Sequence, residues 1–108
     1  MKSMFKKLDS AAEEIKLIVT QGRKAKEVLD PKAIQLFKGM YTALERYYQK
    51  FESSWEALVD EFEDAERSSE FPTDAYQEIK NSMRRYYYEA IATFQAFEKP
   101  APPVGATS

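Results

Sequence analysis

The longest regular pattern in this chain lies in residues 34–65, which read IQLFKGMYTALERYYQKFESSWEALVDEFEDA. Within it an apolar side chain recurs at alternating steps of three and four residues: Ile34, Phe37, Tyr41, Leu44, Tyr48, Phe51, Trp55, Leu58, Phe62 and Ala65. This spacing places all ten on one side of an α-helix and is typical of a coiled coil. We call this row the central stripe. It predicts a long helix whose stripe is covered by the rest of the chain or by another protein.

The composition favours an all-α protein and removes many kinds of chemistry. The chain has 108 residues, enough for one domain, and only three glycines, too few for the turns of a β-fold. It has neither Cys nor His, so disulfides, thiolate nucleophiles, imidazole bases and most transition-metal sites are excluded. Without a long apolar run we expect neither a membrane-spanning helix nor a secretory signal. We therefore expect a soluble, cytoplasmic protein that is not an enzyme and holds no cofactor or metal.

Two breaks divide the chain. Asp30 reads as an N-cap, and Pro31 suits the first helical position, where its missing N–H costs nothing. The second break lies in residues 68–73, where Pro72 biases Phe71 out of the helical region and the threonine that follows can cap the next helix.

These breaks predict three helices, over about residues 4–29, 31–67 and 73–98, within a helical bundle of residues 1–99. The first helix carries a stripe of its own: Met4, Leu8, Ala11, Ile15, Ile18, Gly22, Ala25 and Leu29. A capping box starting at Ser10 is an alternative beginning for it. The third carries a broader stripe: Ala75, Tyr76, Ile79, Met83, Tyr86, Tyr87, Ala90, Ile91, Phe94 and Phe97. The proline-rich tail, residues 100–108, is predicted to be disordered.

The helix lengths predict an antiparallel three-helix bundle with a long central helix. Short connections force both neighbours antiparallel to the helix over 31–67. Both neighbours are shorter than that helix, so they cannot cover it along its whole length. We expect the ends of the central stripe, at Ile34, Phe37 and Phe62, to be covered on one side only and therefore open to a partner.

Charge changes sign along the chain. Residues 1–50 carry eleven Lys or Arg and six Asp or Glu, whereas residues 51–80 carry two and ten. Antiparallel packing brings Lys6 and Lys7 toward the acidic side chains of the central helix, which favours this orientation. The acidic run at residues 60–66 fits either a solvated helix face or a docking patch for a basic partner, and the sequence leaves both open.

Adjacent aromatic side chains indicate an exposed aromatic surface. Tyr47 is followed by Tyr48, and Arg84 and Arg85 are followed by three tyrosines. A helix turns by about 100° per residue, so one core cannot bury neighbours like these, and some must point outward. Exposed tyrosine beside arginine is typical of protein interfaces.

In length, helical content and a central tryptophan the chain resembles the small WXG-type helical hairpins that specialised bacterial secretion systems export. It departs from that family at Trp55, which is followed by Glu56 and Ala57 where the family has a turn-forming glycine. It also has no tyrosine with an acidic residue four positions later among Tyr86, Tyr87 and Tyr88. The sequence therefore does not place the chain in that family.

These patterns favour a non-enzymatic protein-interaction or assembly module of the adaptor type, which we expect to bind itself or another protein. Its expected partner-binding residues are Ile34, Phe37, Tyr47, Tyr48, Phe62, Arg84, Arg85, Tyr87 and Tyr88. Nucleic acid is not an expected partner, because the aromatic and arginine cluster carries too little positive charge.

The sequence is also compatible with two alternatives. The first is a small-molecule carrier with an aromatic-lined cavity inside the bundle. The second is a peripheral membrane protein that binds through residues 1–8, where Met4, Phe5 and Leu8 stand among three lysines. We do not expect membrane binding to be the main function.

Overall fold

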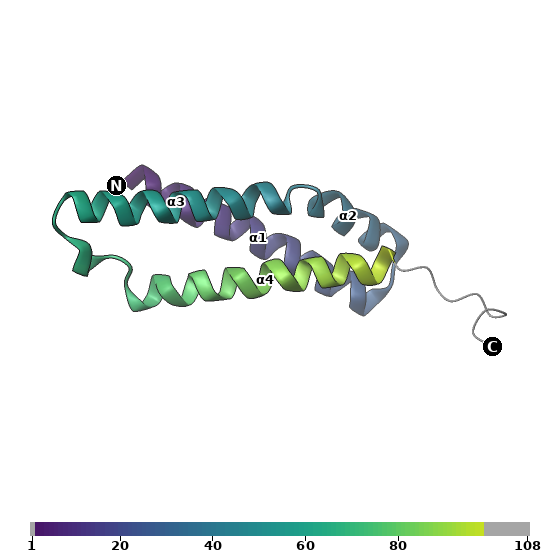
Figure 1. Cartoon of the computed structure of the whole chain (residues 1–108). Coiled ribbons are helices and arrows are strands. Elements are labelled where there is room, and N and C mark those ends of the chain that lie inside the picture. The colour runs from purple at the N-terminus through teal and green to yellow at the C-terminus, as the bar shows by residue number, and fades with distance from the viewer. Residues whose placement is uncertain (1, 99–108) are drawn as a thin grey trace.

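The computed structural model describes residues 2–98, and within that range it is all-helical, as predicted. Its elements are α1 Lys2–Val28, α2 Pro31–Tyr41, α3 Leu44–Asp64, the short 3-10 helix η1 Ser68–Glu70 and α4 Asp74–Glu98 (Figure 1). The predicted disordered tail at residues 100–108 lies outside the described residues.

Side chains cap the helices at the predicted breaks. The Lys32 amide donates to Asp30 Oδ1 at 3.1 Å, and Pro31 occupies the first turn of α2. The Tyr76 amide donates to Thr73 Oγ1 at 3.1 Å, so Thr73 caps the start of α4. The capping box at Ser10 does not form a helix start, because α1 begins at Lys2 and continues through that position.

The single helix predicted over residues 31–67 is wrong, because the chain breaks between α2 and α3. The Thr42 amide donates to Gly39 O at 3.3 Å and the Ala43 amide to Met40 O at 3.1 Å, both to the carbonyl three residues earlier. The Thr42 hydroxyl also donates to Gly39 O, at 2.7 Å. Such short-range bonds tighten the chain into a turn and offset the axis of α3 from that of α2 (Figure 1).

The end of α3 also differs from the prediction. Glu66 has a φ of 58°, the left-handed region, and its amide donates to Glu63 O at 2.9 Å. The Arg67 amide donates to Phe62 O at 2.7 Å. These two bonds and the left-handed residue form a Schellman motif, which ends the helix at Asp64.

The helix at the centre of the molecule is α1. The chain runs out along α1, returns through α2 and α3, and runs out again along α4 (Figure 1). α1 packs against all three other α-helices, whereas the backbones of α3 and α4 come close at few points. The α1 face that they cover includes Ala11, Ala12, Gly22 and Ala25, whose small side chains allow close approach. Residues 31–67 are therefore not the central spine that their stripe predicts.

The rings of Phe37 and Phe62, at the two ends of the central stripe, are buried, which corrects the expectation that they are open; Ile34 is half-buried. At one end Phe62 is buried beneath Phe71, with ring centres 5.5 Å apart. At the other end Phe37 is fully buried against Gly22 of α1, and its ring centre lies 5.9 Å from that of Phe97. The loop before α4 supplies Phe71 and the last turn of α4 supplies Phe97. Phe71 thus covers Phe62 from outside the predicted helices, whereas Phe97 belongs to the predicted third helix and covers Phe37 at the other end of the central stripe.

An aromatic cluster closes the end of the bundle that holds Phe62. Phe71 lies at its centre, with ring centres 5.7 Å from Phe5, 5.0 Å from Trp55 and 5.7 Å from Tyr76. Phe71 is buried although its backbone is extended. The cluster therefore joins α1, α3 and α4 through one residue of a connecting segment.

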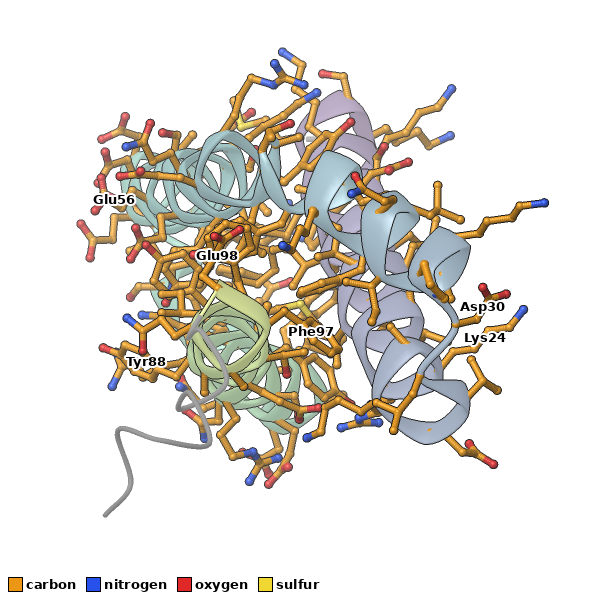
Figure 2. The ribbon with its side chains drawn as sticks, turned by 90° about the vertical axis from the view of Figure 1, so that its right-hand side faces the viewer. Lys24, Asp30, Glu56, Tyr88, Phe97 and Glu98 are labelled. Atoms are coloured by element: carbon orange, nitrogen blue, oxygen red, sulfur yellow. The ribbon has the colours of Figure 1, made fainter. Side chains whose placement is uncertain are left out.

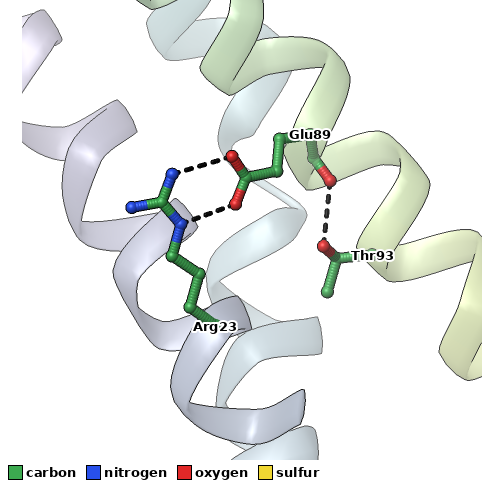
Figure 3. A network of polar contacts seen from close by, with 3 residues as sticks. All are labelled: Arg23, Glu89 and Thr93. Carbon is green, nitrogen blue, oxygen red and sulfur yellow. Dashed lines mark hydrogen bonds and ion pairs between the residues drawn. The ribbon is translucent and has the colours of Figure 1, made fainter. Parts of the chain in front are cut away.

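An ion pair links the C-terminal part of α1 to α4. Arg23 donates from Nε to Glu89 Oε2 at 2.7 Å and from Nη2 to Glu89 Oε1 at 2.8 Å (Figure 3). The hydrogen bonds from Arg23 lower the pKa of the Glu89 carboxyl and raise the pKa of the guanidinium. One turn later Thr93 is buried, and its hydroxyl donates to Glu89 O at 2.9 Å, so its polar atom is satisfied inside the bundle.

Candidate protein-binding face

Two stacked aromatic pairs join α4 to the helices that face it: one pair connects α4 to α2, and the other connects α4 to α3. The rings of Tyr41 and Phe94 are parallel within 5°, with centres 4.1 Å apart. The rings of Tyr48 and Tyr87 are parallel within 12°, with centres 4.2 Å apart. Large flat rings can span helices whose backbones stay apart, so α3 and α4 meet through side chains although their backbones come close at few points.

Tyr88 is the exposed aromatic next to these stacks. Its side chain is 62% exposed, and it lies on the outer side of α4, away from Lys24 and Asp30 of the α1–α2 end (Figure 2). Its ring centre is 5.7 Å from that of Tyr87. The bundle therefore presents Tyr88 to solvent beside a ring that is already held in place.

Two arginines share this surface. Arg84 precedes Tyr88 by four residues and Arg85 by three, so all three lie on one side of α4, and both arginines are exposed. Arg85 Nη2 donates to Ser82 Oγ at 3.2 Å. We call Arg84, Arg85 and Tyr88 the arginine–tyrosine face.

The structure brings only part of the predicted site together. Tyr48 and Tyr87 stack beside the arginine–tyrosine face and are half-buried. Tyr47 is half-buried against the core, with the Arg46 guanidinium 5.4 Å from its ring centre. Ile34, Phe37 and Phe62 lie elsewhere, the first half-buried and the other two buried. The latter two present no surface to a partner in this conformation.

Sequence reasoning missed a set of exposed aliphatic side chains on α1, α2 and their connection. They are Leu17, Val28, Leu29 and Leu36, each more than half exposed. Leu17 and Leu36 fall outside the three-and-four spacing of the stripes, and this position is the feature of the sequence that indicates their exposure. Isolated exposed leucines are common on protein surfaces, so these four do not define a site by themselves.

The acidic run at residues 60–66 combines an outward acidic surface with one inward ring. Asp60, Glu63, Asp64 and Glu66 are exposed, whereas Phe62 is buried between them. The last turn of α3 contains no basic residue, and the nearby Arg67, whose guanidinium lies 5.2 Å from the Phe62 ring centre, is paired with Glu70. This end of the molecule therefore carries a concentrated negative charge on its surface.

A small hollow opens at the break between α2 and α3. It has a volume of about 150 Å³ and is lined by Tyr41, Thr42, Leu44, Glu45, Tyr87 and Ile91. Burial raises the pKa of both tyrosine hydroxyls in this lining, and the Glu45 carboxylate raises the pKa of both further. The hollow thus combines two aromatic rings, two aliphatic side chains and a carboxylate.

Within residues 2–98 no three His, Cys, Asp or Glu side chains gather in a way that could hold a metal ion. In the same range no helix is long and apolar enough to cross a membrane. Comparison of the chain with protein-family models, curated proteins and solved structures found no match. What the chain does must therefore be inferred from its own surface and fold.

Proposed function

We propose that the chain is a non-enzymatic helical interaction module that associates with a second copy of itself through the arginine–tyrosine face. The observation that carries this proposal is the 62% exposure of Tyr88 beside two exposed arginines. Tyrosine and arginine dominate the binding energy of many protein interfaces. Tyr88 also has few rotatable bonds and sits on a regular helix, so little entropy is lost when it is covered.

The chemistry of this face favours an acidic partner surface. Arginine pairs with carboxylates through two parallel hydrogen bonds, and two neighbouring arginines can hold two of them. The exposed carboxylates of Asp60, Glu63 and Asp64 meet that requirement on the same chain. They lie in the C-terminal turns of α3, on a different helix from the arginine–tyrosine face, so we expect a second copy to supply them. Charge complementarity of this kind sets the orientation of partners and their rate of encounter.

Sedimentation at several protein concentrations tests the proposal. We expect the average mass to rise with concentration at low salt and to rise less at high salt, because exposed charges are screened. Tyr88→Ala and the double variant Arg84→Gln/Arg85→Gln should remain monomeric under the same conditions. The matched control is Lys16→Gln/Lys24→Gln, which removes two exposed positive charges from α1. A monomer at every concentration and salt would contradict self-association.

A mixing experiment tests the pairing of the two surfaces. The variant Arg84→Gln/Arg85→Gln keeps the acidic run, and the variant Asp60→Asn/Glu63→Gln keeps the arginine–tyrosine face. Each should be monomeric alone, and an equimolar mixture should form a one-to-one complex through the two intact surfaces. If neither variant associates in the mixture although the unmodified chain does, the acidic run is not the partner surface.

The membrane-binding alternative is less well supported by the positions of its apolar residues. Leu8 is fully buried, and Phe5 packs with its ring centre 6.2 Å from that of Phe62. Insertion of the N-terminal segment into a lipid interface requires apolar side chains that are free to leave the protein. The cost of exposing this end of the core therefore favours protein binding over membrane binding.

A further inference from the structure

The hollow at the α2–α3 break exists because the long helix is interrupted there. α2 ends at Tyr41 and α3 begins at Leu44, and the turn between them leaves a space that α4 covers with Tyr87 and Ile91. The Tyr41–Phe94 stack lies on one side of the break and the Tyr48–Tyr87 stack beyond it. Both lining tyrosines are therefore held by a second ring.

The volume of the hollow suits a compact ligand. A cavity of about 150 Å³ is large enough for a molecule the size of benzene. Leu44 is buried and Ile91 half-buried, so the aliphatic part of the lining belongs to the packed interior. Glu45, in contrast, is an exposed residue of the lining.

The electrostatics of the hollow favour a positive ligand. Of the six lining residues only Glu45 is charged at neutral pH, and it acts on the hydroxyls of both Tyr41 and Tyr87. Gln49 Nε2, one turn further along α3, donates to Glu45 Oε1 at 3.4 Å and leaves the charge of the carboxylate in place. Aromatic rings attract cations through their electron-rich faces, and a nearby carboxylate adds to that attraction. Stacking covers one face of each lining tyrosine, so the attraction for a cation rests on the opposite faces and on the Glu45 carboxylate.

We infer that the hollow binds a small quaternary ammonium ion. A primary ammonium is strongly hydrated and needs three hydrogen-bond acceptors when it leaves water. A quaternary ammonium donates no hydrogen bond and loses less hydration, so rings and one carboxylate satisfy it. An anion is disfavoured by Glu45. This site is separate from the arginine–tyrosine face and does not depend on self-association.

Titration with tetramethylammonium chloride, followed by NMR of the Leu44 and Ile91 methyl groups, tests the inference. Both signals should shift in a saturable way at a protein concentration where the chain is monomeric, and sodium chloride at equal ionic strength should not reproduce the shift. tert-Butanol has nearly the same shape without the charge, so it should bind at least tenfold more weakly.

Two variants isolate the contribution of the carboxylate. Glu45→Gln keeps the shape of an exposed side chain, so the fold should persist while the affinity for tetramethylammonium falls about tenfold. Glu52→Gln removes an exposed carboxylate two turns further along α3 and should leave the affinity within twofold. The inference is overturned if tetramethylammonium causes no saturable shift, if tert-butanol binds equally well, or if Glu45→Gln binds as the unmodified chain does.

Discussion

Gly22 lies directly beneath the ring of Phe37, and this contact sets the distance between α1 and α2. A Cβ atom built on Gly22 would be 2.8 Å from Phe37 Cε1, closer than two carbon atoms can approach. Phe37 is fully buried, so its ring has no free space into which to move. At this scale a missing side chain is as important for packing as a large one.

The two helical glycines predict opposite effects of the same substitution. Gly22→Ala should lower the free energy of unfolding by about 1–3 kcal/mol, because overpacking outweighs the gain in helix propensity. Gly39→Ala should raise it by about 0.5–1 kcal/mol, since nothing lies within 4 Å of the new methyl group. Urea unfolding of both variants measures the difference. Equal effects would mean that α1 and α2 are not in close contact at Gly22.

Phe71 is the second residue whose role depends on its contacts. Phe71→Ala should lower the free energy of unfolding by about 3–5 kcal/mol, because it opens a cavity among Phe5, Trp55, Phe62 and Tyr76. Thermal unfolding followed by circular dichroism measures this loss. Leu36→Ala is the control, since Leu36 is 55% exposed and its loss should cost less than about 0.5 kcal/mol. Similar results for the two variants would contradict the buried position of Phe71.

At the scale of the elements, nearby residues in the sequence predict some helix ends but not others. Asp30, Pro31 and Thr73 act where their types predict, because N-caps are satisfied by side chains close in sequence. The break at Thr42 was not predicted, because threonine and alanine also occur inside helices and the stripe keeps its spacing across the turn. The end of α3 depends on Glu66 in a left-handed conformation that glycine usually adopts.

The ion pair between α1 and α4 predicts a pH dependence. The pKa of Glu89 is lowered by its hydrogen bonds from Arg23, so the folded state binds a proton less readily than the unfolded state. The pair therefore stabilises the fold above the ordinary pKa range of a Glu carboxyl. Its contribution is lost as the pH falls through the lowered pKa of the folded state.

Glu89→Gln tests this dependence. The variant should unfold at a lower denaturant concentration than the unmodified chain at pH 7, and the difference should disappear once the pH falls below the lowered pKa of Glu89. Glu56→Gln, which removes an exposed carboxylate of α3, should show a smaller difference at pH 7. A difference between Glu89→Gln and the unmodified chain that stays constant with pH would mean that the hydrogen bonds of Glu89 do not depend on its charge.

At the scale of the whole molecule, α1 is the element that every other α-helix covers. The segments with most tertiary contact open least often, because opening them requires the whole domain to unfold. We therefore expect the slowest amide hydrogen exchange at Ile15, Ile18 and Val19, in the buried middle of α1. Exchange measured by NMR tests this order. Slower exchange in α3 than in α1 would contradict this order and would mean that α3, not α1, is the most protected helix of the fold.

The candidate site was predictable in its residue types but not in its geometry. Adjacent tyrosines and arginines indicated an aromatic surface, and Tyr88, Arg84 and Arg85 are exposed. Helix lengths alone predict that Phe37 and Phe62 are open. Their cover comes from Phe97 and Phe71, whose approach depends on how the chain returns in three dimensions.

The all-helical class, the caps at Asp30 and Thr73 and the surplus of tyrosine follow from local sequence, because helix periodicity and capping involve residues only a few positions apart. Which helix is central, where the long helix breaks and which rings stay exposed depend on contacts between distant residues. Gly22 meets Phe37, Tyr48 meets Tyr87 and Phe5 meets Phe71 only when the helices pack. The central stripe is regular in sequence. In the folded chain, however, the helices that carry it, α2 and α3, pack against α1, and the break between them leaves the hollow at Tyr41.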